Sequence, residues 1–270
     1  MMGPSHALSG AAAWLAGSWA LEYTGRVAHQ TPLELAVGTA VCAGGALLPD
    51  LDLSGRVSTG QGGATVAHTF GRPSLFLAEV VEKVSLFVYS ATRTRRDPQR
   101  RNGHRTLTHT LPFTVGVGFL TTWACIQGGK WAVMGILFFL LGLALRGLFS
   151  TWAARAGWVL ISIVSAAAAF GTYVYLPAGR GYPLLGVAAG VGCFVHLMGD
   201  IVTRAGIPIL WPIPTGRRMW RMVSVPNAFA VSVGGRVERI FLRGAFTLIS
   251  LAAAVGLVGP TVLEKLGLKL

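Results

Sequence analysis

Charged residues are scarce in this sequence. They make up 12% of its 270 residues, while 53% are hydrophobic, and a soluble domain carries about 25% charged residues. A chain with so little polar surface does not cover its apolar residues against water as a soluble domain does. The length suits one compact bundle. The composition therefore predicts a single domain over residues 1–270, an all-α, polytopic transmembrane helical bundle.

Cysteine is also scarce, and its placement excludes the sites that cysteine usually builds. Cys42, Cys125 and Cys193 all lie inside apolar runs, and no CxxC pair occurs. The sequence therefore offers neither a disulfide framework nor a thiolate metal site. We expect the three side chains to be small buried hydrophobes.

Acidic residues are few as well. Ten Asp and Glu stand against 23 Lys and Arg, which gives a formal net charge of +13. In a soluble protein this charge would suggest a nucleic-acid partner. In a membrane protein, Lys and Arg concentrate in cytoplasmic loops and set the topology, which is the interpretation we prefer. The arginine-rich stretch 94–103 also suits the anionic headgroups of membrane lipids.

Seven apolar stretches approach the length of about 20 residues that a membrane-spanning helix needs. They lie at about 6–22, 33–49, 106–126, 131–148, 157–176, 183–203 and 240–258. An eighth stretch, 73–90, carries Glu79, Glu82 and Lys83 in mid-run. Charges at the bilayer centre cost on the order of 2.5–3.5 kcal/mol each. We therefore predict that this stretch is an amphipathic helix at the membrane interface.

Seven spans with the N-terminus inside give two long inside loops, 50–105 and 204–239. Five basic residues then fall outside, namely Arg26, Lys130, Arg180, Lys265 and Lys269. The other 18 lie inside, as the positive-inside rule requires. We expect Trp211 and Trp220 to anchor the 204–239 segment at the interface.

Eight ionisable residues lie at predicted membrane-helix ends, all on the inner face. They are His6, Asp50, Asp52, His104, His109, His196, Asp200 and Glu238. Ionisable groups at such positions are functional candidates by default. His196 and Asp200 share one helix face because they are four residues apart. We expect His29 and His68, by contrast, to be ordinary packed or capping residues.

His104 and His109 are five residues apart in "GHRTLTHT". On a helix this spacing would splay the two rings by about 140°. They therefore converge only if His104 lies in the loop before the helix.

Mixed histidine and carboxylate ligands predict a divalent metal, most simply zinc, although manganese and iron accept the same ligands. Eight groups exceed the needs of one zinc ion and predict two or more ions, as in two-metal phosphoester hydrolysis. Asp50 or Asp52 would act as general base or would orient a histidine. Arg105, or else Arg204, would hold a phosphate because arginine offers a planar pair of donors.

Five segments resemble the YdjM-like family, in order along residues 1–243. They are "SHALSG", "LLPDLD", "HRTLTHT", "HLMGDIVTRAGIPILWPI" and "GGRVERIF". The resemblance implies a multi-pass, metal-dependent hydrolase of the bacterial inner membrane, of a LexA-regulated type, with the eight polar residues as its site. A more distant likeness to zinc-dependent phospholipase C implies a cluster of zinc ions and a phosphoester substrate such as a phospholipid. With the topology above, the N-terminus and the site are cytoplasmic.

Two other functional classes stay open. A metal-ion or proton transporter also places His and Asp in membrane helices, but it needs them near the bilayer midplane. A scaffold that binds single-stranded nucleic acid needs aromatic residues interleaved with its arginines. The arginine runs lack them, so we expect no specific nucleic-acid partner.

Overall fold

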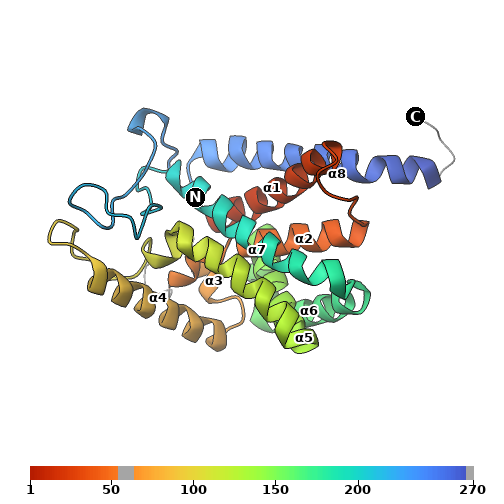
Figure 1. The fold of residues 1–270 in the computed structure, drawn as a ribbon, viewed down its shortest axis with the longest axis horizontal. Coiled ribbons are helices and arrows are strands. Elements are labelled where there is room, and N and C mark those ends of the chain that lie inside the picture. Colours follow the sequence, from red (N-terminus) through yellow and green to blue (C-terminus); the bar gives the residue numbers. More distant parts are fainter. Residues whose placement is uncertain (54–63, 266–270) are drawn as a thin grey trace.

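The computed structural model describes residues 1–53 and 64–265, and these residues form helices joined by loops (Figure 1). The longer helices are α1 (Gly3–Tyr23), α2 (Pro32–Gly45), α4 (Arg72–Thr92), α5 (Leu111–Leu148), α6 (Ser150–Tyr175), α7 (Ala178–Ile201) and α8 (Arg243–Lys265). The shorter ones are η1 (Pro49–Asp52), α3 (Ala64–Ala67), η2 (Leu107–His109), η3 (Asn227–Phe229) and η4 (Val237–Leu242). Within the described ranges there is no β-strand, only three isolated bridges between loop residues. The all-α prediction is confirmed. Arg56 and Lys269, which enter the charge count, lie outside those ranges.

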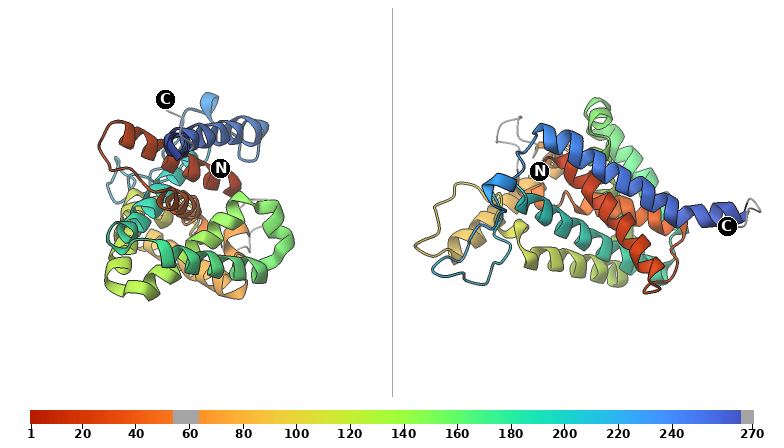
Figure 2. Two further views of the ribbon diagram at one scale, coloured as in Figure 1. Left: turned by 90° about the vertical axis from the view of Figure 1, so that its right-hand side faces the viewer. Right: turned by 90° about the horizontal axis from the view of Figure 1, so that it is seen from above.

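The centre of the bundle is α2, which packs against α1, α5 and α7. α5 and α7 form the most extensive helix pair, and α8 lies along α1 at the edge (Figure 2). Cys42 of α2 and Cys193 of α7 are completely buried in this core, as is Cys125, and all three are free. The expectation that the cysteines are buried hydrophobes is confirmed.

Within residues 1–53 and 64–265, five helical stretches are long and apolar enough to cross a membrane. They are Pro32–Asp52, Leu111–Leu148, Ser150–Tyr175, Gly181–Ile201 and Val237–Gly259. The 38-residue α5 is broken at Gly129, where φ is 55°, so its two halves correspond to the expected spans 106–126 and 131–148. α1 is not among the five, and its sequence is rich in Ala, Gly and Ser. The transmembrane bundle is thus confirmed, and the count of seven spans stays a prediction.

α4 covers the predicted stretch 73–90 and is not one of the five candidate spans. One face of it, which includes Ala78 and Ser85, is buried, and the helix packs on η1. The opposite face leaves Phe76 and Phe87 about 70% exposed (69% and 72%). A helix with one face on the protein and large apolar side chains on the other matches an amphipathic helix at the interface.

Two loop regions, which follow α4 and α7 in the chain, project together from the end of the bundle that holds the N-terminus (Figures 1 and 2). Asp97 joins them, because its carboxylate accepts hydrogen bonds from the backbone N–H groups of Met219 and Trp220 at 3.1 and 3.2 Å. Trp220 is only 2% exposed and stacks on Trp211 at a centroid distance of 4.9 Å. The expectation that Trp220 anchors the membrane interface is therefore wrong, because its ring is packed inside the loop assembly.

Candidate metal centre

Two helices bring three of the predicted residues together at one end of the bundle. His6 lies in the first turn of α1, and His196 and Asp200 lie near the end of α7. The rings of His6 and His196 stack with centroids 3.7 Å apart. Nε2 of His6 is 3.3 Å from Oδ1 of Asp200. All three side chains are buried, so the four-residue spacing in α7 places its pair on the inward face.

η1 and η2 add Asp50 and His109 to this group. Nε2 of His109 is 3.3 Å from Nε2 of His196, 3.6 Å from Oδ2 of Asp200 and 3.9 Å from Oδ1 of Asp50. Nε2 of His196 is 3.8 Å from the same two carboxylate oxygens. In a tetrahedral zinc site with bonds of about 2.0–2.1 Å, the ligand atoms lie about 3.3–3.4 Å apart. The five distances that involve a histidine nitrogen run from 3.3 to 3.9 Å, so these atoms lie at or somewhat beyond that spacing.

The hydrogen bonds of His109 and His196 fix where their ring protons lie. Nδ1 of His196 is 2.8 Å from the carbonyl oxygen of Ala46, which only accepts, so Nδ1 carries the proton. The hydroxyl of Thr108 donates to Oδ2 of Asp52 at 2.6 Å and is left to accept from Nδ1 of His109 at 3.0 Å. In both neutral rings Nε2 is therefore an unprotonated acceptor. Two such nitrogens 3.3 Å apart repel each other unless a cation lies between them.

The two aspartates of η1 have different surroundings. Asp52 is completely buried, its Oδ1 accepts from Nδ1 of His104 at 2.8 Å, and its Oδ2 accepts from the backbone N–H of Arg105 at 3.1 Å. Its oxygens are thus committed to orienting the histidines, a usual role for a carboxylate behind metal ligands. Asp50 is 6% exposed, and its Oδ1 faces the histidine Nε2 atoms.

His104 lies in the loop before η2, and its ring is 5.2 Å from that of His109. The sequence predicts that the rings of His104 and His109 converge only if His104 lies in the loop before the helix, and His104 does lie there. Its side chain is 25% exposed, more than any other histidine of the cluster. Burial alone would lower the pKa of His104, but attraction to the Asp52 carboxylate outweighs it and raises the pKa.

Arg105 lies against the cluster. Its Nη2 is 2.9 Å from Oδ2 of Asp200, and its Nη1 donates to Thr203 Oγ1 and to the carbonyl of Gly206, both at 3.2 Å. Its φ of 55° is uncommon for a residue other than glycine, and the surrounding contacts hold it there. These contacts use three of its five N–H groups. Arg204, the other candidate for binding a phosphate, is exposed.

Glu238 takes part in a different set of contacts. Its Oε1 accepts from the backbone N–H of Met2 at 2.6 Å, and its Oε2 accepts from that of Gly234 at 2.7 Å. It thereby fastens the start of α1 to η4. The α-amino group of Met1, next to it in the chain, lies 2.6 Å from Oδ1 of Asp200. Glu238 is thus not brought together with the other predicted ligands.

Three overlapping groups of side chains offer ligand atoms within 4.8 Å of one another. They are His6–Asp50–His196, Asp50–His104–His109 and His109–His196–Asp200. Both ring nitrogens of His6 are buried and have no hydrogen-bond partner among the described residues. A buried polar atom without a partner is costly. The group around His6 therefore fits a cation as well as the other two groups do.

Sequence reasoning missed two groups that set the geometry. One is Thr108, whose only signal is a hydroxyl residue directly before His109. The other is the carbonyl of Ala46, a backbone group for which the sequence carries no signal. Close packing of the two helices brings this carbonyl within reach of His196, because Gly192 of α7 lies directly against the backbone at Cys42 and Ala46.

The fold and this site define a class: an all-helical integral membrane protein with a buried histidine–aspartate cluster at one end of its bundle. The family described as YdjM inner membrane protein matches residues 1–262, and the chain belongs to that family. The resemblance expected from the sequence motifs is confirmed. Searches of curated proteins and of solved structures found no match.

Proposed function

We propose that this inner-membrane protein is a metal-dependent hydrolase that cleaves a phosphoester, such as that of a phospholipid. The observation that carries the proposal is the convergence of two unprotonated Nε2 atoms, of His109 and His196, with the carboxylates of Asp50 and Asp200. Nitrogen and carboxylate ligands at this spacing suit zinc best, and manganese or iron would accept the same set. The overlapping group of Asp50, His104 and His109 would hold a second ion.

When bound, divalent ions in such a site act as Lewis acids on a phosphoryl oxygen and make water a better nucleophile. Asp50 would accept a proton from the attacking water, because it is the more exposed aspartate and Asp52 is committed to the histidines. The water oxygen bonds to phosphorus, the ester P–O bond breaks, and the proton passes to the leaving alcohol. Arg105 would hold the phosphate with N–H groups that it does not use on Asp200.

Placement favours a hydrolase over a transporter. His6 and Asp200 lie in terminal turns of their helices, and His196 lies one turn before Asp200. η1 and η2 lie outside the helices that they adjoin. A transporter holds its ligands near the bilayer midplane, with access from both sides. The two arginine-rich loops project from the same end as the cluster (Figure 1). The positive-inside rule then supports a cytoplasmic site and a cytoplasmic N-terminus.

The experiment is metal analysis of the purified protein by mass spectrometry, with His196→Ala and Asp50→Ala as variants. His29→Ala is the matched control, because His29 pairs with Glu22 after α1, away from the cluster, and its side chain is 59% exposed. We expect close to stoichiometric zinc in the wild type and the control, and loss of it in both variants. Equal, substoichiometric metal in all four proteins would end the hydrolase proposal.

A panel of phospholipids then tests the activity, with release of a phosphorylated product as the readout. Metal retention without cleavage of any phosphoester, together with metal flux in proteoliposomes, would favour the transporter instead.

A further inference from the structure

The two projecting loops enclose a basic cavity of about 440 Å3. It is lined by Arg96 from one loop and by Thr215, Arg217, Arg218 and Arg221 from the other. No ion pair of the described residues involves any of these four arginines, and all four are exposed. Four guanidinium groups around one cavity repel one another, so an anion would stabilise this arrangement.

Asp97 holds the walls of the cavity in place. Its Oδ2 accepts from the N–H and the hydroxyl of Thr94 at 2.8 and 2.9 Å, and its carboxylate also binds the N–H groups of Met219 and Trp220. The hydroxyl of Thr94 also contacts the carbonyl of Arg217 at 3.0 Å. These hydrogen bonds hold together the backbone of the two loops that carry the arginines.

An apolar cleft of about 540 Å3 lies close to the basic cavity along the chain, because Ile213 lines the cleft and Thr215 lines the cavity. Its walls are the first turns of α5, which include Val115 and Gly116, and the loop that ends at Ile213. Ile213 and Thr215 are two residues apart, so their Cα atoms are at most about 7 Å from each other. Ile213 is 64% exposed.

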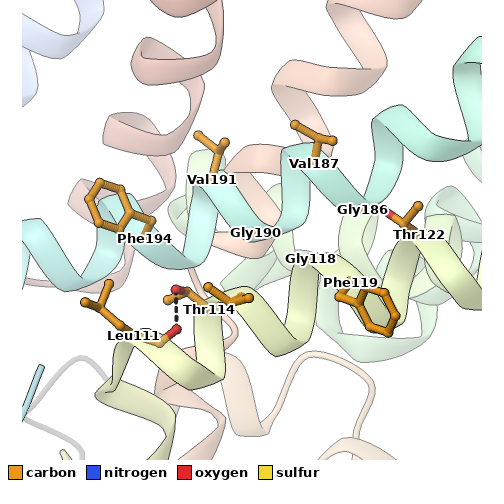
Figure 3. A pocket seen from close by; sticks show the side chains of 11 residues that line it. Leu111, Thr114, Gly118, Phe119, Thr122, Gly186, Val187, Gly190, Val191 and Phe194 are labelled. Atoms are coloured by element: carbon orange, nitrogen blue, oxygen red, sulfur yellow. Dashed lines mark hydrogen bonds between the residues drawn. The ribbon is translucent and has the colours of Figure 1, made fainter. Parts of the chain in front are cut away.

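The cleft continues into a groove between α5 and α7, which shares Leu111, Val115 and Phe119 with it (Figure 3). The groove measures about 620 Å3, and its floor is formed by Gly118 and Gly190. Both helices are candidate membrane spans. Apolar grooves thus run along two candidate membrane-spanning helices, and the lining of one of them ends two residues before that of the basic cavity.

We propose that these features form a binding site for an anionic phospholipid, distinct from the metal centre. The phosphate of the headgroup occupies the cavity of Arg96, Arg217, Arg218 and Arg221, and an acyl chain occupies the cleft of Val115, Gly116 and Ile213. Basic pockets at the ends of transmembrane helices bind anionic headgroups in this way. The proposal stands without hydrolase activity, because none of these residues contacts the histidine–aspartate cluster in the described contacts.

The apolar cleft distinguishes this ligand from a nucleic acid. A nucleic acid would use the arginines but has no tail to fill the cleft, and nonspecific strand binding uses exposed aromatic platforms. Trp220, the aromatic nearest in sequence to Arg221, is buried in the stack with Trp211.

The test measures lipid retention by native mass spectrometry of the full-length protein in mild detergent. Phosphatidylglycerol and phosphatidylcholine with identical acyl chains are the probes. We expect the wild type to retain phosphatidylglycerol more tightly. The double variant Arg217→Gln, Arg218→Gln should weaken this binding roughly 10- to 30-fold, since each basic residue near the surface contributes to attraction of anionic lipid.

Gly116→Leu tests whether the acyl chain occupies the cleft. A Cβ at Gly116 meets no atom within 4 Å, and the leucine side chain would take up space in the cleft that Gly116 lines. It should weaken both lipids and leave binding of inorganic phosphate unchanged. The matched controls are Gly135→Leu, another open position of α5, and Arg155→Gln in α6. All variants should keep wild-type metal content.

Equal retention of the two lipids by the wild type would overturn the proposal. So would displacement of phosphatidylglycerol by inorganic phosphate at comparable concentration, which would indicate a site for a free anion. Displacement by a short oligonucleotide, with no effect of Gly116→Leu, would indicate a nucleic-acid site and would also overturn it.

Discussion

Nε2 of His109 and Nε2 of His196 lie 3.3 Å apart, and both rings carry their proton on Nδ1. While both rings are neutral, no hydrogen bond joins these two atoms, because neither has a proton to give. The neutral pair is therefore unfavourable unless a cation, either a metal ion or a proton, lies between the two nitrogens.

This arrangement predicts how stability responds to metal. Zinc should raise the unfolding temperature of the wild type, since a ligand that binds only the folded state stabilises it. In His196→Ala the response to zinc should vanish. The metal-free variant should also be less stable than the metal-free wild type, because it lacks the stack on His6 and the hydrogen bond to Ala46. Thermal unfolding in detergent, with chelator or with zinc, measures both. A wild-type response to zinc in the variant would show that His196 is not a ligand.

Thr108 links Asp52 to His109 through one hydroxyl. Thr108→Val keeps the shape but removes that link, and loss of such supporting contacts usually costs about 10- to 100-fold in metal affinity. Thr108→Ser keeps the hydroxyl and should bind metal as the wild type does. Zinc titration against a competing chelator gives the affinities. Equal zinc affinities of the Val and Ser variants would show that the hydroxyl of Thr108 does not support metal binding.

Gly192 permits the contact between α7 and α2 on which the bond from His196 to Ala46 depends. A methyl group in Gly192→Ala would meet the backbone of α2 at Cys42, and overpacking of this kind costs about 1–3 kcal/mol. We expect a lower unfolding temperature together with weaker zinc binding. Gly135→Ala, at an open helical position, should be neutral or stabilising by up to about 1 kcal/mol.

The hydrogen bonds of Asp97 predict that the contact between the loops after α4 and α7 is sensitive to acid. Burial raises the pKa of Asp97, but hydrogen bonds from Thr94, Met219 and Trp220 outweigh it and leave the pKa below the usual value. A carboxylate with a lowered folded pKa contributes stability above its unfolded pKa, about 3.9. This stability is lost as the pH falls through the lower folded value. The near-ultraviolet circular dichroism of the stacked Trp211 and Trp220 should persist to about pH 4 and weaken below it.

Asp97→Asn is the companion variant for this measurement. It should weaken the tryptophan signal already at neutral pH and remove the acid step. An unchanged acid step in Asp97→Asn would assign the transition to another group.

The sequence predicts the helices well because their signals are local. The helix breaks at Gly129 and Gly157 lie close to the boundaries of the predicted apolar runs. The charges in the middle of α4 distinguish that helix from a membrane span. Most of the site follows too, because ionisable residues at membrane-helix ends are rare. The separation of roles does not follow. Asp50 and Asp52 are two residues apart in one motif, and their different roles depend on residues far away in the chain. Asp52 accepts a hydrogen bond from His104, whereas Asp50 faces Nε2 of His196.

Glu238 and Trp220 show where local signals mislead. Glu238 is a carboxylate at a helix end, which is why the sequence predicts it to be a metal ligand. Trp220 is a tryptophan in a membrane-proximal loop, which is why the sequence predicts it to lie at the interface. Their contacts are set by segments far away in the chain, Met2 for Glu238 and Asp97 for Trp220. No short window of sequence around Glu238 contains Met2, and none around Trp220 contains Asp97.

The candidate ligands span the chain from residue 6, in the first helix, to residue 200, at the end of α7. During synthesis the first histidine emerges before any of its partners, and the pair in α7 emerges only after most of the membrane helices have been made. Metal capture would therefore come late in biogenesis, after helix insertion, and would report that α1, α2, α5 and α7 have docked correctly. A chain whose helices insert but do not assemble would present no complete set of ligands, so metal content would serve as a measure of maturation.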